Sequence, residues 1–275
     1  NKIESLNKDL DKSITKIFSS LSDWQISQIA RHPLRPYTLD YITNMFSDFI
    51  EIHGDRMFGD DKAMICGFAK IDTESVMLIG HQKGRESKEK VFRNFGMPKP
   101  EGYRKALRAM KLAEKFNIPI LTLVDVPGFM PGTAQEYGGI IKHGAKLLFA
   151  YAEATTPKVT LITRKAYGGA YDVMNSKHIG ADMNYAWPSA EIAVMGAKGA
   201  VEIIYRSQSL NQEKIKKKTE QYEERFANPF IAAEKGYIDD VIMPRSSRKR
   251  LVRAFKSLKG KKVNNPWKKH DNIPL

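Results

Sequence analysis

Near the start of the chain, apolar residues recur every three or four positions, and the positions between them are mostly charged or polar. This spacing is typical of an amphipathic helix, which we expect over residues 3–21. The apolar stripe consists of Ile3, Leu6, Leu10, Ile14, Ile17 and Leu21. A short helix is expected between Ser22, as its N-cap, and Pro33, and Thr38 can cap a third helix that runs to about Phe46. We place this N-terminal helical extension at residues 1–50.

From residue 63 onward, short apolar segments alternate with helical patterns. Residues 63–71 and 76–81 read as two strands joined by a hairpin at 72–75. Further strands are expected over 118–124, 158–163, 184–187 and 192–195, and helices over 100–116, 137–153, 197–205 and 245–258, with a short one from Gly168. Residues 207–220 are polar and lysine-rich, and we expect an exposed excursion there. The alternation predicts an α/β domain with a largely parallel sheet, which we place at residues 51–275.

Length and composition narrow the class of protein. The chain has 275 residues, enough for one large domain, and no apolar run approaches the ~20 residues that cross a bilayer. The single cysteine, Cys66, excludes an internal disulfide framework, and the N-terminus carries no secretory signal. We therefore expect no membrane attachment and a reducing compartment, which is the cytoplasm or, after removal of a leader, the plastid stroma.

The net charge of +14 is concentrated in the last quarter of the chain. Residues 206–275 hold 18 Lys or Arg against 8 Asp or Glu. Excess positive charge attracts polyanions, so a nucleic-acid-binding or scaffold role is an alternative of another class. No basic motif is interleaved with aromatic residues, which limits this to non-specific binding, and a solvated basic surface is the simpler interpretation. The six histidines and Cys66 show no metal-ligand spacing, so no metal is expected.

Two glycine-containing turns, each following an apolar strand, carry the candidate chemistry. The first strand and turn span residues 121–132, and the second strand, turn and helix start span residues 159–172. In parallel sheets, ligands gather beyond the carboxyl ends of the strands, and glycines let backbone N–H groups approach them. Two such turns can direct two N–H donors at one oxygen, as in an oxyanion hole. Ordinary tight turns explain the glycine spacing equally well, while Walker and G-x-G-x-x-G patterns are missing.

These motifs resemble the biotin-dependent acyl-CoA carboxyltransferases in two ways. Residues 29–127 resemble the alpha subunit of the acetyl-CoA carboxylase carboxyltransferase, chiefly through residues 80–86 and 93–106. Residues 125–275 resemble the C-terminal half of propionyl-CoA carboxylase beta chains. That second match rests on residues 125–139, 164–172, 184–188, 195–202, 226–230 and the ending 272–275.

The resemblance implies a crotonase-like (ClpP/crotonase) ββα superhelix and a transferase activity. The implied reaction moves a carboxyl group from carboxybiotin to acetyl-CoA, giving malonyl-CoA for fatty acid biosynthesis, with this chain as an alpha-type subunit of acetyl-CoA carboxylase. The alternatives are a propionyl-CoA carboxyltransferase and a carboxybiotin decarboxylase subunit. Biotin on a carrier protein is the implied cofactor and a coenzyme A thioester the substrate. The implied partners in a hetero-oligomer are a beta-type carboxyltransferase subunit, biotin carboxyl carrier protein and biotin carboxylase.

The resemblance also implies which residues act on biotin. At the matching positions, Gly169 and Ala170 supply backbone amides to the ureido oxygen, and Gly128 and Phe129 of the first turn supply the partner amide. Gly168 and Gly132 belong to the same two turns and are expected to contact the cofactor. The family mechanism needs no side-chain base, so His81 and His143 are expected to be structural.

Three charged residues are candidates for substrate contacts. Asp172 matches a position that helps to set acyl length in the propionyl family, and a solvent-facing or capping carboxylate is an equally good interpretation. Lys83 and Arg85 lie in a basic stretch beside a strand end, where they can contact the phosphates of coenzyme A. A solvated loop explains the same stretch more simply.

Overall fold

The computed structural model describes residues 2–21, 25, 29, 32, 34–206, 208, 211–226 and 228–265. The chain divides into two compact units, residues 1–35 and residues 36–275. The first unit contains α1 (Lys2–Ser19), which confirms the helix predicted from apolar spacing. None of the residues of α1 is buried. The helix expected between Ser22 and Pro33 lies mostly outside the described residues, and the domain boundary near residue 50 stays a prediction.

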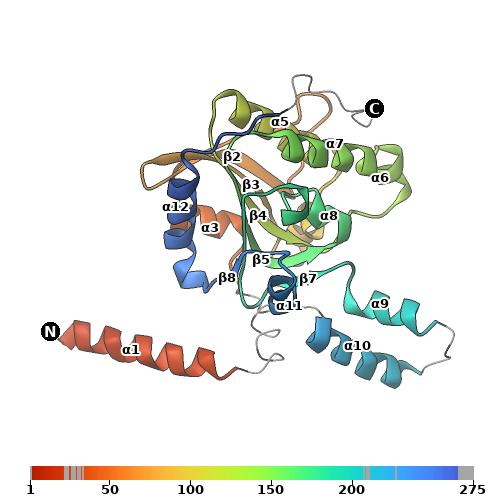
Figure 1. Cartoon of the computed structure of the whole chain (residues 1–275). Coiled ribbons are helices and arrows are strands. Elements are labelled where there is room, and N and C mark those ends of the chain that lie inside the picture. Colours follow the sequence, from red (N-terminus) through yellow and green to blue (C-terminus); the bar gives the residue numbers. More distant parts are fainter. Residues whose placement is uncertain are drawn as a thin grey trace. The chain divides into compact units, whose positions relative to one another are not determined.

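The second unit is built on an eight-stranded sheet in the order β1-β2-β3-β4-β5-β6-β8, with β7 paired to β5 (Figure 1). The strands are β1 (Ser47–Glu51), β2 (Met64–Ile71), β3 (Glu74–His81), β4 (Ile120–Val126), β5 (Lys158–Tyr167), β6 (Met183–Ala186), β7 (Glu191–Ala193) and β8 (Asp240–Val241). The β1–β2 and β2–β3 pairs are antiparallel, and every later pair is parallel. The predicted largely parallel sheet is confirmed. β1 escaped prediction because Phe49 and Ile50 are its only apolar residues.

Helices cover both faces of this sheet, because the central strands are apolar on both sides. Along β4, Ile120 and Val124 belong to one buried cluster, while Leu121 and Leu123 belong to the other. The first cluster lies under α5 (Pro100–Lys115) and α7 (Ile140–Glu153), and the second lies under α3 (Thr38–Met45) and α12 (Ser247–Leu258) (Figure 1). Because β3 to β8 pair in parallel, their carboxyl ends lie at one common edge of the sheet.

The helix predicted over residues 137–153 begins three residues later than expected, and a separate short helix precedes it. The structure has a short α6 (Thr133–Tyr137) followed by α7 (Ile140–Glu153). Gly139 between them has a left-handed backbone with φ of 77°, which stops one helix and starts the next.

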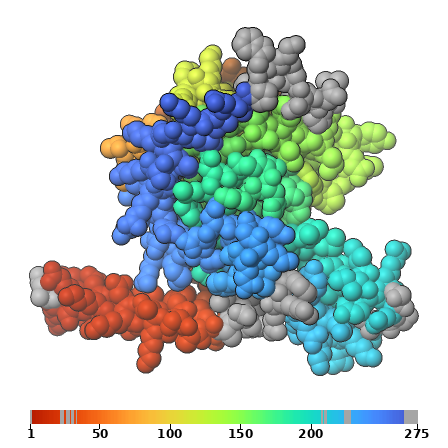
Figure 2. All heavy atoms as spheres, viewed as in Figure 1, coloured from red at the N-terminus to blue at the C-terminus, as the bar shows by residue number. Residues whose placement is uncertain are grey.

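Two polar segments are helical rather than irregular. The expected excursion at 207–220 contains most of α10 (Gln212–Phe226), which packs against α9 (Ala197–Ile204). Figure 2 shows the atoms of these two segments side by side. The basic stretch after β3 contains α4 (Ser87–Phe92). Lys, Glu and Gln are good helix formers, so a polar run with little apolar periodicity can still be helical.

Thr38 is not the N-cap that the sequence predicted for α3. Tyr37 takes the N-cap position, and the Asp40 carboxylate accepts a hydrogen bond of 2.7 Å from its backbone N–H. The buried Thr38 hydroxyl instead donates to the carbonyl of His81 at the end of β3. This bond attaches α3 to the edge of the sheet that carries the glycine turns.

Candidate functional site at the carboxyl ends of the strands

The two predicted glycine turns leave neighbouring strands at the same edge of the sheet. β4 and β5 are paired in parallel, with Val126 opposite Ala166 just before the turns begin. Gly128 and Gly132 in the first turn have φ of 142° and 124°, and Gly168 in the second has φ of 57°. L-residues with side chains rarely adopt such values, so glycine is needed for the backbone path.

Phe129 brings the two turns into contact. A Cβ placed on Gly169 would lie 3.0 Å from Cε2 of Phe129, so the ring rests directly against the backbone of the second turn. The same ring lies 2.9 Å from where a Cβ of Gly144 in α7 would be, and its centroid is 5.4 Å from that of Tyr103. Glycines on two elements thus create the space that the Phe129 ring fills.

The second turn opens directly into α8 (Gly168–Asp172). The first N–H groups of a helix have no carbonyl partner within it, so they are available to a ligand. Gly169 is exposed and Ala170 is buried, and an added Cβ at Gly128 or Gly132 would meet nothing within 4 Å. Phe129 and Gly169 are therefore in contact, and Gly128 and Gly132 border open space.

Asp172 ends α8 and is half-buried. Burial raises the pKa of its carboxyl above the ordinary value, while nearby His178 lowers it. Among the described residues, no hydrogen bond to its carboxylate is formed, which argues against a capping role. Its part in setting acyl length stays a prediction.

Lys83 and Arg85 lie close together in sequence but form separate ion pairs. The Lys83 ammonium lies 2.5 Å from Oδ1 of Asp125, and only 13% of the Lys83 side chain is exposed. Arg85 lies 2.6 Å from the Asp40 carboxylate and covers the ring of Tyr37. Their contacts with coenzyme A phosphates stay predictions, and Arg85 is the more accessible of the two, with 39% of its side chain exposed.

Asp125 lies near the end of β4 and was not among the residues predicted to act in the site. Burial opposes ionisation of its carboxyl, but Lys83 and Arg164 outweigh burial and hold its pKa below the ordinary value. Burial lowers the pKa of Lys83 as well, although the Asp125 carboxylate opposes this shift. The backbone N–H of Asp125 donates to Nδ1 of His81 at 3.3 Å, and burial lowers the pKa of His81 to about 3. A neutral His81 agrees with the structural role expected of it.

A second buried contact supports the turn from the other side. The Tyr167 hydroxyl, at the N-cap of α8, donates to the carboxylate of Glu191 in β7. Both residues are buried. No local sequence signal indicates this bond, because its partners lie 24 positions apart and meet only when β7 pairs with β5.

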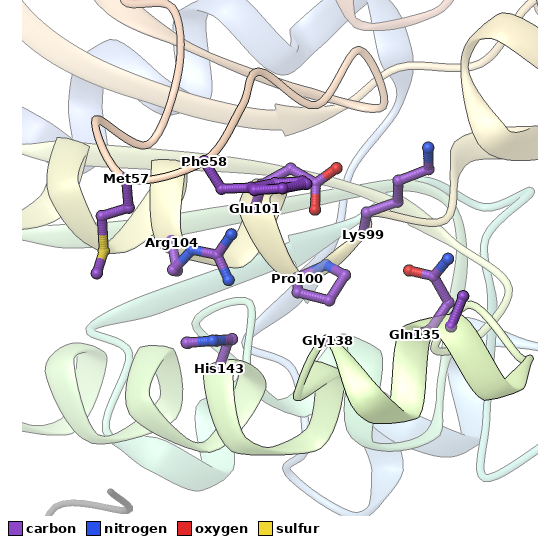
Figure 3. A pocket seen from close by; sticks show the side chains of 10 residues that line it. Met57, Phe58, Lys99, Pro100, Glu101, Arg104, Gln135, Gly138 and His143 are labelled. Atoms are coloured by element: carbon purple, nitrogen blue, oxygen red, sulfur yellow. The ribbon is translucent and has the colours of Figure 1, made fainter.

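A cavity of about 510 Å³ lies apart from the predicted site, between the loop at Met57 and Phe58, the start of α5, and α6 with α7 (Figure 3). Arg104 lies across from His143 and donates through Nε to Asp55 at 2.7 Å. Burial and the Arg104 charge lower the pKa of His143 to about 4, so this imidazole is neutral at pH 7. None of the predicted site residues lines the cavity.

Comparison with known sequences gives a consistent result over almost the whole chain. A sequence profile of the family described as Carboxyl transferase domain matches residues 24–273. The propionyl-CoA carboxylase beta chain of Cereibacter sphaeroides is 56% identical over 250 residues, which cover 90% of this chain and 47% of that protein. The mitochondrial beta chain of Homo sapiens is 54% identical over 214 residues, covering 78% of this chain and 38% of that protein. The chain thus spans less than half the length of these curated relatives.

Solved structures agree. Transcarboxylase 12S, described as a hexamer assembly with methylmalonyl-coenzyme A and methylmalonic acid bound, superposes with a TM-score of 0.78 at 39% identity, covering 88% of this chain and 46% of that one. The beta subunit of P. aeruginosa geranyl-CoA carboxylase superposes at 0.68 with 22% identity, covering 93% and 48%, and supports the fold alone. The expected crotonase-like fold is confirmed.

These relatives overturn one expectation from the sequence. The conversion of acetyl-CoA to malonyl-CoA for fatty acid biosynthesis, within an acetyl-CoA carboxylase, was wrong, because the high-identity relatives are propionyl-CoA carboxylase beta chains. The separate resemblance of residues 29–127 to an alpha subunit is not supported, since profile and relatives run continuously across residue 125. Short identical runs suggested a change of family that the longer alignment does not contain.

Proposed function

Because the chain belongs to the carboxyl transferase domain family, we propose that it forms part of a propionyl-CoA carboxyltransferase, which moves a carboxyl group from carboxybiotin to propionyl-CoA. The observation that carries this proposal is the 56% identity to a propionyl-CoA carboxylase beta chain across 90% of this chain. The likeness to transcarboxylase supports a three-carbon acyl acceptor as well, since that protein binds methylmalonyl-coenzyme A, the carboxylated form of propionyl-CoA.

The two glycine turns are the part of the chain that acts on the cofactor. Biotin, when bound on its carrier protein, supplies the transferable carboxyl group. The amides of Gly169 and Ala170, with that of Gly128 or Phe129, would hold the ureido oxygen of biotin, where donated hydrogen bonds would stabilise negative charge. Exposed Gly169 beside the Phe129 ring fits a flat polar group on an apolar support. Asp172 lies four residues beyond Gly168, where it can limit the size of the acyl group.

We propose that a complementary half completes this site. The chain spans less than half of its relatives, and large apolar side chains near the turns are exposed. Tyr137 is 92% exposed, Val194 82% and Ile141 61%. Exposed apolar residues of this size mark an interface, so we propose that the thioester-binding half covers them and excludes water. A biotin carboxyl carrier protein and a biotin carboxylase complete the proposed oligomeric assembly.

Reconstitution tests the proposal directly. The chain is mixed with the thioester-binding half of a propionyl-CoA carboxylase beta chain and with a carboxylated biotin carrier, and methylmalonyl-CoA and malonyl-CoA are measured. We expect transfer to propionyl-CoA to exceed transfer to acetyl-CoA, with neither half active alone. Equal or greater transfer to acetyl-CoA would contradict the propionyl assignment. Loss of CO₂ from the carrier that does not depend on any acyl-CoA would instead indicate the carboxybiotin decarboxylase alternative.

A further inference from the structure

The β4–β5 pairing is irregular just before the glycine turns. Val124 pairs with Ile162, but Val126 pairs with Ala166, so two steps along β4 correspond to four along β5. Extra residues of this kind form a bulge, which bends a strand and changes the direction in which its end points. The bulge therefore sets where β5 delivers the second turn relative to the first.

Side chains replace the backbone hydrogen bonds that the bulge interrupts. The Asp125 carboxylate accepts from the backbone N–H of Lys165 at 3.2 Å, and the Thr163 hydroxyl donates to the carbonyl of Val124 at 3.1 Å. Asp125 uses the same oxygen, Oδ1, to accept from the Lys83 ammonium at 2.5 Å. One carboxylate oxygen thus connects the chain just after β3, the end of β4 and the bulge of β5.

Lys83 is itself held in position from several directions. Its aliphatic stem lies against Gly96, where an added Cβ would come within 2.5 Å of Lys83 Cγ. The Gln82 side chain donates to the Lys83 carbonyl and accepts from the backbone N–H of Leu39, which attaches this segment to α3. The Asp125 side chain is only 6% exposed, so this is an ion pair shielded from solvent.

A shift of the bulge moves the two turns, because only a few residues separate them from it. Gly128 follows Asp125 by three positions and Gly168 follows Lys165 by three. Phe129 packs against Gly169, so a shift of the bulge changes the contact between the turns. We propose that the Lys83–Asp125 ion pair is a positioning device, which fixes the bulge of β5 and thereby the spacing between the two glycine turns.

The expected effect of this ion pair on catalysis rests on the proposed function. The positioning role also gives Lys83 a different task from a coenzyme A phosphate contact. Loss of a phosphate contact raises the KM for acyl-CoA, whereas a misplaced oxyanion-binding amide lowers kcat. Misplacement of a binding site by about 1 Å can cost ~100-fold in rate, so the two roles are separable by kinetics.

The test compares K83M and D125N with a matched control, K261M. Lys261 forms a similarly sheltered pair with Asp182 at 2.8 Å, which accepts from the backbone N–H of Lys158 at the opposite end of β5. In the reconstituted enzyme, we expect K83M and D125N to lower kcat ~10- to 100-fold with the KM for propionyl-CoA within about twofold. K261M is expected to keep kcat within about twofold.

Amide chemical shifts of the full chain provide a readout that needs no activity. We expect the Gly128 and Gly169 amide signals to move in K83M and D125N but not in K261M. Folded K83M with unmoved glycine signals, or with a raised KM and unchanged kcat, would overturn the proposal. If K83M does not fold, the double variant K83M/D125N replaces it, because it removes both charges together. An inactive wild-type mixture would count against the proposed function, while the glycine signals still decide the positioning role.

Discussion

Gly168 has a backbone conformation that only glycine adopts readily, and it also lies against the backbone of Val194, just after β7. Its φ is 57°, and an added Cβ would lie 2.7 Å from the carbonyl oxygen of Val194. We expect G168A to lower the free energy of unfolding by ~2–4 kcal/mol, since left-handed strain of ~1–2 kcal/mol adds to a backbone clash. The clash also displaces the amides of the second turn, so transferase activity should fall.

Gly180 provides the control for this change, because it has a φ of 88° with nothing within 4 Å of an added Cβ. G180A carries only the strain, so urea unfolding should show a loss of ~1–2 kcal/mol and unchanged transfer. Equal losses in the two variants would contradict the clash with Val194.

Asp55 makes the stability of the protein depend on pH in acid. Burial would raise the pKa of its carboxyl, but hydrogen bonds from the amides of Phe58 and Met57 and from Arg104 outweigh burial and lower it from 3.8 to about 2. A folded-state pKa below the unfolded value contributes stability that is present above about pH 4 and is lost as the pH falls towards 2. The shift corresponds to about 2 kcal/mol.

Urea unfolding of wild type and D55N at pH 5, 4, 3 and 2 measures this contribution. The difference between the two proteins should shrink by about 2 kcal/mol from pH 5 to pH 2. If the difference in unfolding free energy stays constant from pH 5 to pH 2, the pKa of the Asp55 carboxyl is not lowered by folding.

At the scale of elements, a buried polar contact attaches α12 to the sheet. The indole N–H of Trp187, just beyond β6, donates to the hydroxyl of Ser247 at 2.7 Å, and both side chains are buried. Removing the hydroxyl deletes this buried hydrogen bond, which typically costs ~0.5–1.5 kcal/mol. We expect S247A to lower the free energy of unfolding by this amount.

The neighbouring serine gives the matched control for S247A. Ser246 is the N-cap of α12 but makes no side-chain capping bond, so S246A should change stability by less than ~0.5 kcal/mol. Chemical denaturation followed by Trp fluorescence and circular dichroism measures both variants. A small effect of S247A with a large effect of S246A would reverse the assigned roles.

At the scale of the whole molecule, the basic surplus of the last quarter is partly neutralised by its surroundings. Arg248 pairs with Asp72, Lys259 with Glu74 and Lys261 with Asp182. Each pair joins this part of the chain to acidic residues outside it, on loops at strand ends or at the start of β3. The charge therefore helps to attach the C-terminal helix to the domain.

For this reason we expect no complex with RNA at physiological salt. A gel shift at low salt can show weak binding, which falls steeply as salt rises because counterion release drives it. A stable complex at physiological salt would support the nucleic-acid-binding alternative, which stays a prediction until then.

The assignment of a compartment also belongs to this scale. None of the described helices is long and apolar enough to cross a bilayer. The human relative is described as mitochondrial, and the cytoplasmic or plastid location expected for this chain stays a prediction.

The sequence by itself determined the elements whose residues repeat with a clear period and the local backbone of the turns. Apolar spacing predicted α1, α5, α9 and α12, and the β2–β3 hairpin followed from two apolar runs around residues 72–75. Glycines at 128, 132 and 168 predicted turns, because local conformation depends mostly on neighbouring residues. The family of the carboxyl-transferring domain was also readable from residues 125–139 and 164–172.

Only the tertiary structure decided how these parts meet. Phe129 rests on Gly169, Lys83 reaches Asp125 across 42 positions, and Glu191 receives the Tyr167 hydroxyl. The bulge in β5 is equally invisible in the sequence, because it is a property of two paired strands. Contacts of this kind depend on strand order and register, which the packing of the whole sheet fixes, so the periodicity of any one segment cannot predict them.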